Sequence, residues 1–244
     1  MNATASYRFT IVVPVYNERE NLLRLEERLA AYLDTSLARP ACILLVDDGS
    51  TDGGSALIEE ICSRRPDFFF LRFSRNSGLT AALKAGLAAC ESPLAGYIDA
   101  DLQTDPDDFD LLLPFAEEYA LVTGIRGERK DGFVKRASSK IANAWRRMMT
   151  SDGVADTGCP LKVIQTAYAR KLPLFNGMHR FLPALVQMTG GRVKQVPVHH
   201  YPRVAGTAKY HLLNRLWRPF IDCFGFRWMK KRYIEPPIEK TGLE

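Results

Sequence analysis

The sequence predicts an α/β fold in which a mostly parallel, Rossmann-like sheet is covered by helices on both faces. Short apolar runs rich in β-branched and aromatic residues alternate with segments whose apolar residues recur at helical spacing. The strand-like runs are apolar almost throughout, as in parallel strands that are buried on both faces. Polar clusters follow these runs, and sheets of this kind bind ligands beyond the carboxyl ends of their strands. We therefore expect a ligand site at one edge of the sheet.

The elements of the first half follow in chain order. Strands are predicted at 9–15 (FTIVVPV), 41–46 (ACILLV), 68–73 (FFFLRF) and 95–99 (AGYID). Between them, helical spacing is found from Asn17 on (Leu22, Leu23, Leu25, Leu29), through Leu57, Ile58 and Ile61, and over about 79–90. The polar cluster after each strand is, in order, Asn17-Glu18, Asp47-Asp48, Arg75-Asn76 and Asp99-Asp101.

After residue 120 the pattern is less regular. It predicts strands at 121–125 and 192–198, a helix over about 134–149 and an amphipathic helix over 176–191. A helical stripe runs from His211 to Arg232, and Pro219 should introduce a kink there.

The composition limits the class of protein. Residues are 46% hydrophobic and 25% charged, as in a folded domain rather than a disordered chain. The five cysteines are widely spaced and lack CxxC pairs, which indicates reduced thiols rather than a disulfide framework or a zinc site. No apolar run approaches the about 18 residues of a spanning helix, and the N-terminus lacks a signal-peptide pattern. We therefore expect a cytoplasmic protein.

The two halves of the chain carry opposite charge. Residues 1–120 contain 10 Lys and Arg against 20 Asp and Glu, whereas residues 121–244 contain 23 against 8. An acidic half suits a site that collects a cation, and a basic half suits an anionic partner such as a phosphate or an acidic membrane surface. We expect no nucleic acid partner, because no recognition-helix, zinc or aromatic-sheet motif accompanies the basic charge.

Two carboxylates, Asp99 and Asp101, follow the strand at 95–99. Alternate side chains of an extended segment share a face, so both can approach one hard cation such as Mg²⁺ or Mn²⁺. Such an ion stabilises a diphosphate as a leaving group. On its own, Asp-x-Asp is more often a solvated acidic loop. The pair Asp47-Asp48 has two similar interpretations: a turn that caps the next helix, or a carboxylate that binds a ribose or a base.

Four segments taken together are more specific. In this order they resemble the successive motifs of the family 2 inverting glycosyltransferases, which have the glycosyltransferase-A fold: VPVYNERENL (13–22), VDDGSTDG (46–53), RNSGLTAALKAG (75–86) and DADLQTDP (99–106). The resemblance implies a nucleotide-sugar donor that is bound by Pro14, Tyr16, Asn17, Glu18, Asp47 or Asp48, Arg75, Gly78, Asp99, Ala100 and Asp101. It also implies Mg²⁺ or Mn²⁺ held by Asp99, Asp101 and Gln103.

The second half resembles a narrower group, dolichyl-phosphate mannose synthase and its bacterial polyprenyl-phosphate relatives. Segments similar to the acceptor loops of that group are GIRGERKD (124–131) and VKRASSKIAN (134–143). The resemblance implies an acceptor phosphate bound by Arg126, Lys135 or Arg136, and Ser139. RVAGTAKY (203–210) is similar to the group's R-x-x-G-x-S-K-Y motif, with Ala208 in place of the serine. Arg203 and Lys209 are then the expected contacts to the donor diphosphate.

A phosphate acceptor fits the chemistry that these residues offer. A phosphate monoester is largely dianionic at neutral pH and needs cations that position it rather than a general base. One in-line displacement would invert the anomeric configuration. The segments DTGCPLKV (156–163) and MHRFLPALV (178–186) also resemble the bacterial members. Asp156 is the one candidate base, which we expect to orient other groups, and Cys159 is expected to pack. The catalytic candidates are Asp99, Asp101, Arg203, Lys209 and Asp156.

The chain is expected to consist of a glycosyltransferase domain (1–210), an amphipathic helix (211–232) and a tail (233–244). The helix is rich in aromatic residues and flanked by Arg and Lys. It fits a helix that lies in the membrane interface, and equally one that packs on the domain or on a second subunit. We expect a peripheral protein on the cytoplasmic face of the membrane, and the sequence leaves a homo-oligomer open.

Three functions compete. The leading one is transfer of a sugar from a UDP- or GDP-linked donor to a polyprenyl phosphate such as undecaprenyl or dolichyl phosphate. A UDP-linked hexose or N-acetylhexosamine is favoured over GDP-mannose by the bacterial resemblance. The second is a transferase of the same fold that acts on a saccharide hydroxyl in cell-envelope polysaccharide synthesis. The third is an inactive scaffold that binds nucleotide sugars, against which the intact Asp99 and Asp101 count.

Overall fold

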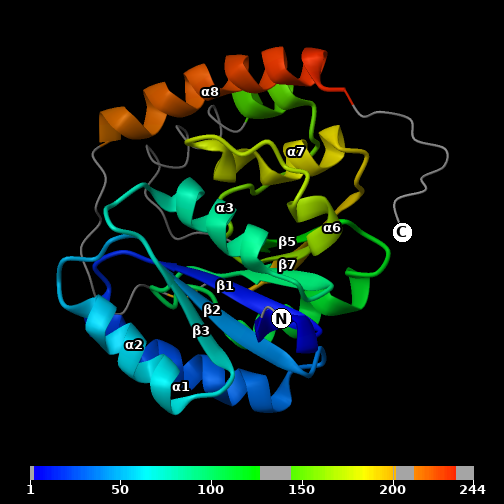
Figure 1. The fold of residues 1–244 in the computed structure, drawn as a ribbon. Coiled ribbons are helices and arrows are strands. Elements are labelled where there is room, and N and C mark those ends of the chain that lie inside the picture. Colours follow the sequence, from blue (N-terminus) through cyan, green and yellow to red (C-terminus); the bar gives the residue numbers. More distant parts are fainter. Residues whose placement is uncertain (1–2, 127–143, 200, 202–211, 235–244) are drawn as a thin grey trace, which may run out of the picture.

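The computed structural model describes residues 3–126, 144–199, 201 and 212–234, and within 212–219 the backbone alone. A seven-stranded sheet crosses this part of the molecule in the order β3-β2-β1-β4-β6-β5-β7 (Figure 1). Neighbouring strands are parallel, except that β6 runs antiparallel to both β4 and β5. The predicted mostly parallel sheet is thus confirmed. The strands are β1 (Phe9–Val15), β2 (Ala41–Asp47), β3 (Phe68–Arg72), β4 (Leu94–Tyr97), β5 (Leu121–Arg126), β6 (Lys162–Gln165) and β7 (Val193–Val198).

Helices cover both faces of the sheet, with α1 and α2 on one side and α3, α6 and α7 on the other (Figure 1). The α-helices are α1 (Arg19–Thr35), α2 (Gly54–Arg64), α3 (Leu79–Ala89), α4 (Phe109–Leu112), α6 (Thr166–Ala169), α7 (Leu182–Met188) and α8 (Leu212–Arg232), and residues 144–150 are also helical. Short 3-10 turns are η1 (Ala3–Ser6), η2 (Pro106–Asp108), η3 (Leu113–Phe115) and η4 (Met178–Phe181).

The alternation of side chains along β1 divides the interior into two cores. Ile11 and Val13 pack with the apolar residues of α1 and α2, whereas Val12 packs with those of α3 and α7. All three are completely buried. A strand that is apolar on both faces therefore joins two helical layers through one sheet.

The second half departs from the sequence pattern in two places. The antiparallel strand β6 was not predicted, and the helix expected over 176–191 is divided into η4 and the shorter α7. Gly177 has a φ of 91°, outside the helical region, Pro183 lies in the first turn of α7, and Gly190 at φ 79° follows its end. These three residues confine the helix to two turns.

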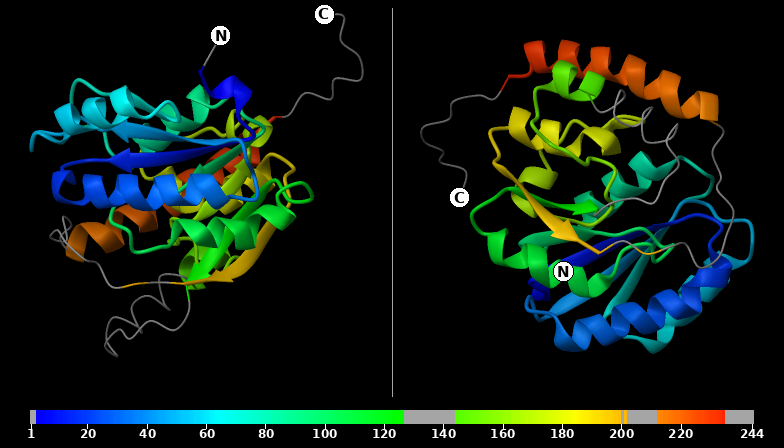
Figure 2. Two further views of the ribbon diagram at one scale, coloured as in Figure 1. Left: turned by 90° about the horizontal axis from the view of Figure 1, so that it is seen from below. Right: turned by 180° about the vertical axis from the view of Figure 1, so that it is seen from behind.

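The C-terminal helix α8 runs without interruption through Pro219 and lies beside residues 144–150 (Figure 2). Its inner side is part of the core: Phe226 is completely buried and stacks on Phe181 with 5.8 Å between the ring centroids. On the exposed side of α8, Phe220 stacks on Trp145 with 4.7 Å between the ring centroids. Within the part of the chain that the structure describes, no helix combines the length and hydrophobicity needed to cross a membrane.

Candidate active site

Parallel strands β1, β2, β3 and β4 end at one edge of the sheet, and a polar cluster follows each of them. The strand register pairs Val15 of β1 with Asp47 of β2, and Asp47 with Arg72 of β3. On the other side of β1, strand β4 leads into the segment that begins at Asp99. The topology therefore brings together motifs that are far apart in the sequence.

Asn17 ties the loop after β1 to the loop after β2. Its backbone N–H donates to Ser50 Oγ (3.0 Å), and its Oδ1 accepts from the Thr51 N–H (2.7 Å). Asn17 has a φ of 51°, a left-handed conformation that asparagine tolerates better than most residues. Glu18 accepts a hydrogen bond from Asn21 Nδ2 (2.7 Å) at the start of α1. The motif thus uses its polar groups to hold two loops together.

Asp48 organises the loop after β3. Its side chain is buried, and its two oxygens accept hydrogen bonds from Asn76 Nδ2 (3.0 Å), the Ser77 N–H (2.7 Å) and the Gly78 N–H (2.8 Å). The last two donors belong to the backbone that enters α3. The Asp48 carboxylate therefore fixes the direction in which α3 begins.

Asp47 is completely buried and accepts from the Ser50 N–H (2.9 Å) and from Ser55 Oγ. Gly49, at φ 71°, lies against the loop after β3, where a Cβ would come within 2.5 Å of the Arg75 carbonyl carbon. Both carboxylates of the Asp47-Asp48 pair have partners inside the protein, and the Arg75 side chain is exposed. Contact of these residues with a nucleotide stays a prediction.

Asp99 is the electrostatically strained carboxylate of the site. Burial raises its pKa to about 6, and the negative charge of Asp101 acts in the same direction. The hydroxyl of Tyr97 donates to Asp99 Oδ1 (2.7 Å) and opposes this shift, as does the charge of Lys162. The two carboxylates that follow this buried strand repel each other, and a cation would relieve that repulsion.

Asp101 closes a tight turn, in which its Oδ1 accepts from the Gln103 N–H (3.2 Å). Leu102 between them has a φ of 53°, which bulky residues seldom adopt. Such conformations occur preferentially where function requires them. The Gln103 carbonyl oxygen accepts from the Tyr201 N–H (2.9 Å), which fastens the turn to the chain beyond β7.

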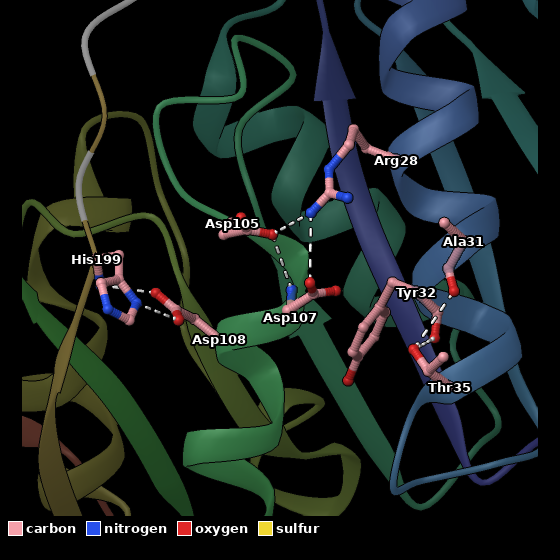
Figure 3. A network of polar contacts seen from close by, with 8 residues as sticks. All are labelled: Arg28, Ala31, Tyr32, Thr35, Asp105, Asp107, Asp108 and His199. Atoms are coloured by element: carbon pink, nitrogen blue, oxygen red, sulfur yellow. Dashed lines mark hydrogen bonds and ion pairs between the residues drawn. The ribbon is translucent and has the colours of Figure 1, made fainter.

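The acidic segment after this turn is held from two sides (Figure 3). From α1, Arg28 contacts Asp105 (2.6 Å) and Asp107 (3.4 Å). From the end of β7, the backbone N–H of His199 donates to Asp108 (2.7 Å), and its Nδ1 lies 2.8 Å from the other oxygen. The hydrogen bond to Asp108 and its charge raise the pKa of His199. The segment after Asp99 and Asp101 is therefore clamped between two elements.

Arg126 and Asp156 form a two-pronged ion pair beside the site. Arg126 Nε donates to Asp156 Oδ2 (2.8 Å), and Nη2 donates to Oδ1 (2.9 Å). Burial acts to raise the pKa of Asp156, but the hydrogen bonds and charge of Arg126 outweigh it and lower the pKa below its ordinary value. A carboxylate held in this way orients a guanidinium and is a poor proton acceptor. The orienting role expected for Asp156 stays a prediction.

Lys162 and Tyr97 are neighbours that the sequence analysis missed. They are register partners across β4 and β6, and the Lys162 ammonium lies 5.6 Å from the centre of the Tyr97 ring. Lys162 is 2% exposed, and burial lowers its pKa. Two features of the sequence could have pointed to them: a lysine inside the apolar run PLKVI, and a tyrosine two residues before Asp99.

The other predicted site residues fall into two groups. Pro14, Tyr16 and Gly78 are partly exposed at the same edge, and Ala100 is buried between the two aspartates. Cys159 is completely buried, and burial raises the pKa of its thiol, as expected for a packing residue. Several residues lie outside the described part of the chain: Lys135, Arg136, Ser139, Arg203 and Lys209.

Residues 10–170 match the profile of the family described as Glycosyl transferase family 2. The chain belongs to this family. It is 32% identical over 237 residues to the dodecaprenyl-phosphate galacturonate synthase of Rhizobium johnstonii, covering 95% of this chain and 70% of the relative. It is 34% identical over 216 residues to an undecaprenyl-phosphate 4-deoxy-4-formamido-L-arabinose transferase of Salmonella paratyphi A, covering 85% of this chain and 64% of the relative. The chain thus spans about two thirds of the length of these relatives.

Solved structures show the same glycosyltransferase-A type of fold for this family 2 chain. One is the glucosyl-3-phosphoglycerate synthase of Mycobacterium tuberculosis with UDP, at a TM-score of 0.67 and 15% identity, covering 99% of this chain and 86% of that one. Another is a mannosyltransferase of Pyrobaculum calidifontis with GDP-Man and Mn²⁺, at a TM-score of 0.63 and 20% identity, covering 95% and 66%. The predicted family and fold are confirmed.

The oxygen ligands at this edge suit a cation for which the protein provides only part of the coordination shell. Among the described residues, no group of three or more His, Cys, Asp or Glu side chains is arranged to hold a metal ion. Two carboxylates and an amide, from Asp99, Asp101 and Gln103, are hard oxygen donors of the kind that Mg²⁺ and Mn²⁺ prefer. Such ions usually complete their coordination with water and substrate phosphate oxygens.

Proposed function

We propose that this glycosyltransferase moves a sugar from a nucleotide sugar to the phosphate of a polyprenyl phosphate, with inversion at the anomeric carbon. The observation that carries the proposal is the similarity, over 95% of the chain, to a relative named as a dodecaprenyl-phosphate galacturonate synthase. The relative from Salmonella paratyphi A is likewise named for an undecaprenyl-phosphate acceptor.

The Arg126–Asp156 pair supports a phosphate acceptor over a hydroxyl. A hydroxyl acceptor needs a base to take its proton, and Asp156 is bound by Arg126 through both of its oxygens. A phosphate dianion needs only cations that direct it. Arg126, Lys135 or Arg136, and Ser139 are the proposed acceptor contacts.

On the donor side, the proposed nucleotide contacts come from the four loops at the sheet edge: Pro14, Tyr16, Asn17, Glu18, Asp47 or Asp48, Arg75, Gly78, Asp99, Ala100 and Asp101. Asp99, Asp101 and Gln103 would hold Mg²⁺ or Mn²⁺, which offsets charge on the donor diphosphate. Arg203 and Lys209 are proposed to contact the same diphosphate.

The proposed reaction is one displacement. An oxygen of the acceptor phosphate forms a bond to the anomeric carbon while the bond from that carbon to the donor diphosphate breaks, and the nucleoside diphosphate leaves with the electron pair. Arg126, fixed by Asp156, would position the attacking phosphate. Arg203 and Lys209 would stabilise the charge on the leaving diphosphate.

The test is to incubate the protein with Mn²⁺ or Mg²⁺, undecaprenyl phosphate and radiolabelled UDP- or GDP-sugars, and to count label that moves into the organic phase. We expect transfer from one donor, and loss of that transfer when Asp101→Ala replaces the wild type. Label on an added glycan instead of the lipid would establish the hydroxyl-acceptor alternative, and nucleotide binding without any turnover would establish the scaffold.

We further propose that α8 holds the protein on the membrane surface. Apolar side chains on its outer side are well exposed: Phe220 (37%), Ile221 (51%), Phe224 (50%) and Trp228 (64%). They share one face, because residues three and four apart lie one above the other on a helix. Cys223 and Phe226 point the other way into the core. The helix therefore offers a rigid aromatic face rather than a loose segment.

The charges around this face suit an anionic bilayer. Two basic residues, Lys231 and Arg232, follow Trp228 in the last turn of α8. Arg227 and Lys230 instead contact Met149 and the carbonyl oxygen of Thr150. The acidic residue Asp222 lies on the inner side, where a Cβ on Gly177 would come within 2.6 Å of its carboxylate. Aromatic and basic residues together are typical of helices that bind the headgroup region of anionic membranes.

Vesicle flotation tests this association. Replacing Phe224→Ser and Trp228→Ser together should weaken binding to phosphatidylglycerol-containing vesicles at least about tenfold, since each buried aromatic side chain contributes a comparable factor. Leu23→Ser is the matched control, because Leu23 is 57% exposed on α1 at the far side of the molecule (Figure 1). A double variant that floats like the wild type, or one that changes only the oligomeric state, would contradict membrane binding by this face.

A further inference from the structure

A short turn, residues 156–159, forms a cradle for the guanidinium group of Arg126. Asp156 accepts two hydrogen bonds from that group, and the Gly158 N–H donates to Asp156 Oδ1 (3.0 Å), which holds the carboxylate in place. Gly158 itself lies close to the guanidinium, because a Cβ there would come within 2.8 Å of Arg126 Nη2. The orientation of Arg126 thus depends on the shape of this turn.

Lys162 holds the same turn from inside the protein. Its ammonium group donates to the carbonyl oxygens of Cys159 and, at 3.5 Å, of Thr157. Within the described residues, no carboxylate lies within ion-pair distance of it. A buried ammonium group requires strong acceptors. Here two carbonyl groups of the turn serve as those acceptors, so the turn and the lysine are mutually dependent.

The position of Lys162 in the sheet makes it a rigid support. It lies on β6, paired with Tyr97 of β4 on one side and with Thr123 of β5 on the other. Arg126 ends β5, three residues beyond Thr123. Both ends of the connection from Lys162 through the turn to Arg126 are therefore anchored in hydrogen-bonded strands. With 2% of its surface exposed, Lys162 is shielded from direct contact with a substrate.

We propose that Lys162 is a positioning residue for the acceptor phosphate, which acts by holding the turn 156–159 in the shape that directs the Arg126 guanidinium. The inference rests on the proposed function, in which Arg126 contacts that phosphate. Removing the ammonium group leaves the carbonyls of Thr157 and Cys159 without their donor, and the turn is then free to release Arg126.

The first experiment compares Lys162→Met with the wild type under steady-state conditions. Methionine keeps the approximate length and volume, and removing a buried charge together with its desolvation need not unfold the protein. We expect the KM for the polyprenyl phosphate to rise about tenfold, because a small misplacement of a substrate-binding group has effects of this size or larger. The KM for the donor should rise less than the KM for the lipid, because Lys162 acts on Asp99 only through its charge, whereas it donates directly to the turn that holds Arg126. The matched control is Lys194→Met. Lys194 lies on β7, with its ammonium group 5.1 Å from the centre of the Phe115 ring, and its replacement should leave both constants unchanged.

A double-mutant cycle with Arg126→Ala separates this role from general loss of structure. If Lys162 acts through Arg126, adding Lys162→Met to Arg126→Ala lowers kcat/KM for the lipid no further. Additive effects, or an equal rise in the KM for donor and acceptor, would overturn the inference. Absence of lipid transfer by the wild type would instead refute the proposed function.

The substitution Gly158→Ala displaces Arg126 directly. It tests whether the turn positions Arg126, should Lys162→Met fail to fold. The new methyl group would meet the end of the Arg126 side chain rather than backbone, so it displaces the guanidinium and leaves the fold intact. We expect the same selective rise in the KM for the lipid. An unchanged KM in a folded Gly158→Ala protein would show that the turn does not position Arg126.

Discussion

The carboxylates at the sheet edge differ in how many hydrogen-bond donors the protein supplies to them. Asp48 is buried, but three donors from the neighbouring loop surround it. Asp99 has the Tyr97 hydroxyl as a donor and the Asp101 carboxylate nearby, and its pKa is raised to about 6. Buried carboxylates without enough donors reduce stability, and those kept despite this are often functional. A metal ion beside Asp99 would offset its repulsion by Asp101.

Replacing Asp99→Asn should stabilise the metal-free protein at neutral pH while abolishing transfer. Since the pKa in the folded protein lies above the ordinary 3.8, the folded protein keeps a proton there between about pH 4 and 6 that the unfolded chain has lost. The free energy of unfolding of the wild type therefore falls as the pH rises through this window. The advantage of the variant should grow from less than about 1 kcal/mol at pH 4 to about 3 kcal/mol at pH 7.5.

Urea unfolding at several pH values with EDTA measures this difference. Adding Mn²⁺ should stabilise the wild type and not Asp99→Asn. A variant that is less stable than the wild type at pH 7.5 without metal would show that Asp99 is not strained.

Among the helices, α3 packs closer to the sheet than side chains normally allow. Gly86 faces β1 and β2, and a Cβ there would lie 2.4 Å from Val12 Cγ1 and 3.1 Å from Val46 Cγ2. Because α3 begins at the loop that Asp48 holds, its separation from the sheet sets the position of Gly78 and its neighbours. The glycine thus couples the packing of a helix to the geometry of the site.

Gly86→Ala should lower the free energy of unfolding by about 1–3 kcal/mol, because the overpacked methyl group outweighs the higher helix propensity of alanine. Gly225→Ala in α8 is the matched control. The nearest atom to its Cβ would be Phe175 Cζ at 3.6 Å, an ordinary contact. We expect this second variant to be neutral or stabilised by up to about 1 kcal/mol. Urea midpoints compare the two, and equal effects would contradict the close approach of α3.

For the whole molecule, the site links parts that fold from distant stretches of the chain. Loops after β1, β2, β3 and β4 form the edge where we propose that the nucleotide sugar binds, while β5 and the turn before β6 supply the Arg126–Asp156 pair. Tyr201 and His199, beyond β7, fasten the last strand to the segment that follows Asp101. A ligand at this edge would therefore stabilise the molecule as a unit.

Thermal unfolding with nucleotides tests this coupling. With Mn²⁺ present, either UDP or GDP at about 100 times its dissociation constant should add about 2.7 kcal/mol and raise the Tm by roughly 5–10 °C. Neither nucleotide should do so with EDTA or in the Asp101→Ala variant. A shift in Tm of the same size without metal would show that nucleotide binding at the proposed site does not require the metal.

The family, the parallel sheet and the position of each motif at a strand end can be predicted from the amino-acid sequence alone. Those strands are uninterrupted apolar runs, because both of their faces are buried, and such runs are visible without any contact information. The four-residue strand β6 contains a lysine and a glutamine, so its pattern was too short and too polar to recognise. Its place in the sheet depends on pairing with β4 and β5, which are distant in the chain.

The contacts of the individual site residues within the protein cannot be predicted in this way, because they form only when the chain folds. Asp48 and Asp99 both follow buried strands, yet one is surrounded by donors and the other faces a second carboxylate. Likewise Lys162 reads as an ordinary lysine in the sequence, and the sheet places it beneath the turn that holds Arg126. The charge state and orientation of a side chain depend on the groups packed around it, and folding brings those groups from elsewhere in the chain.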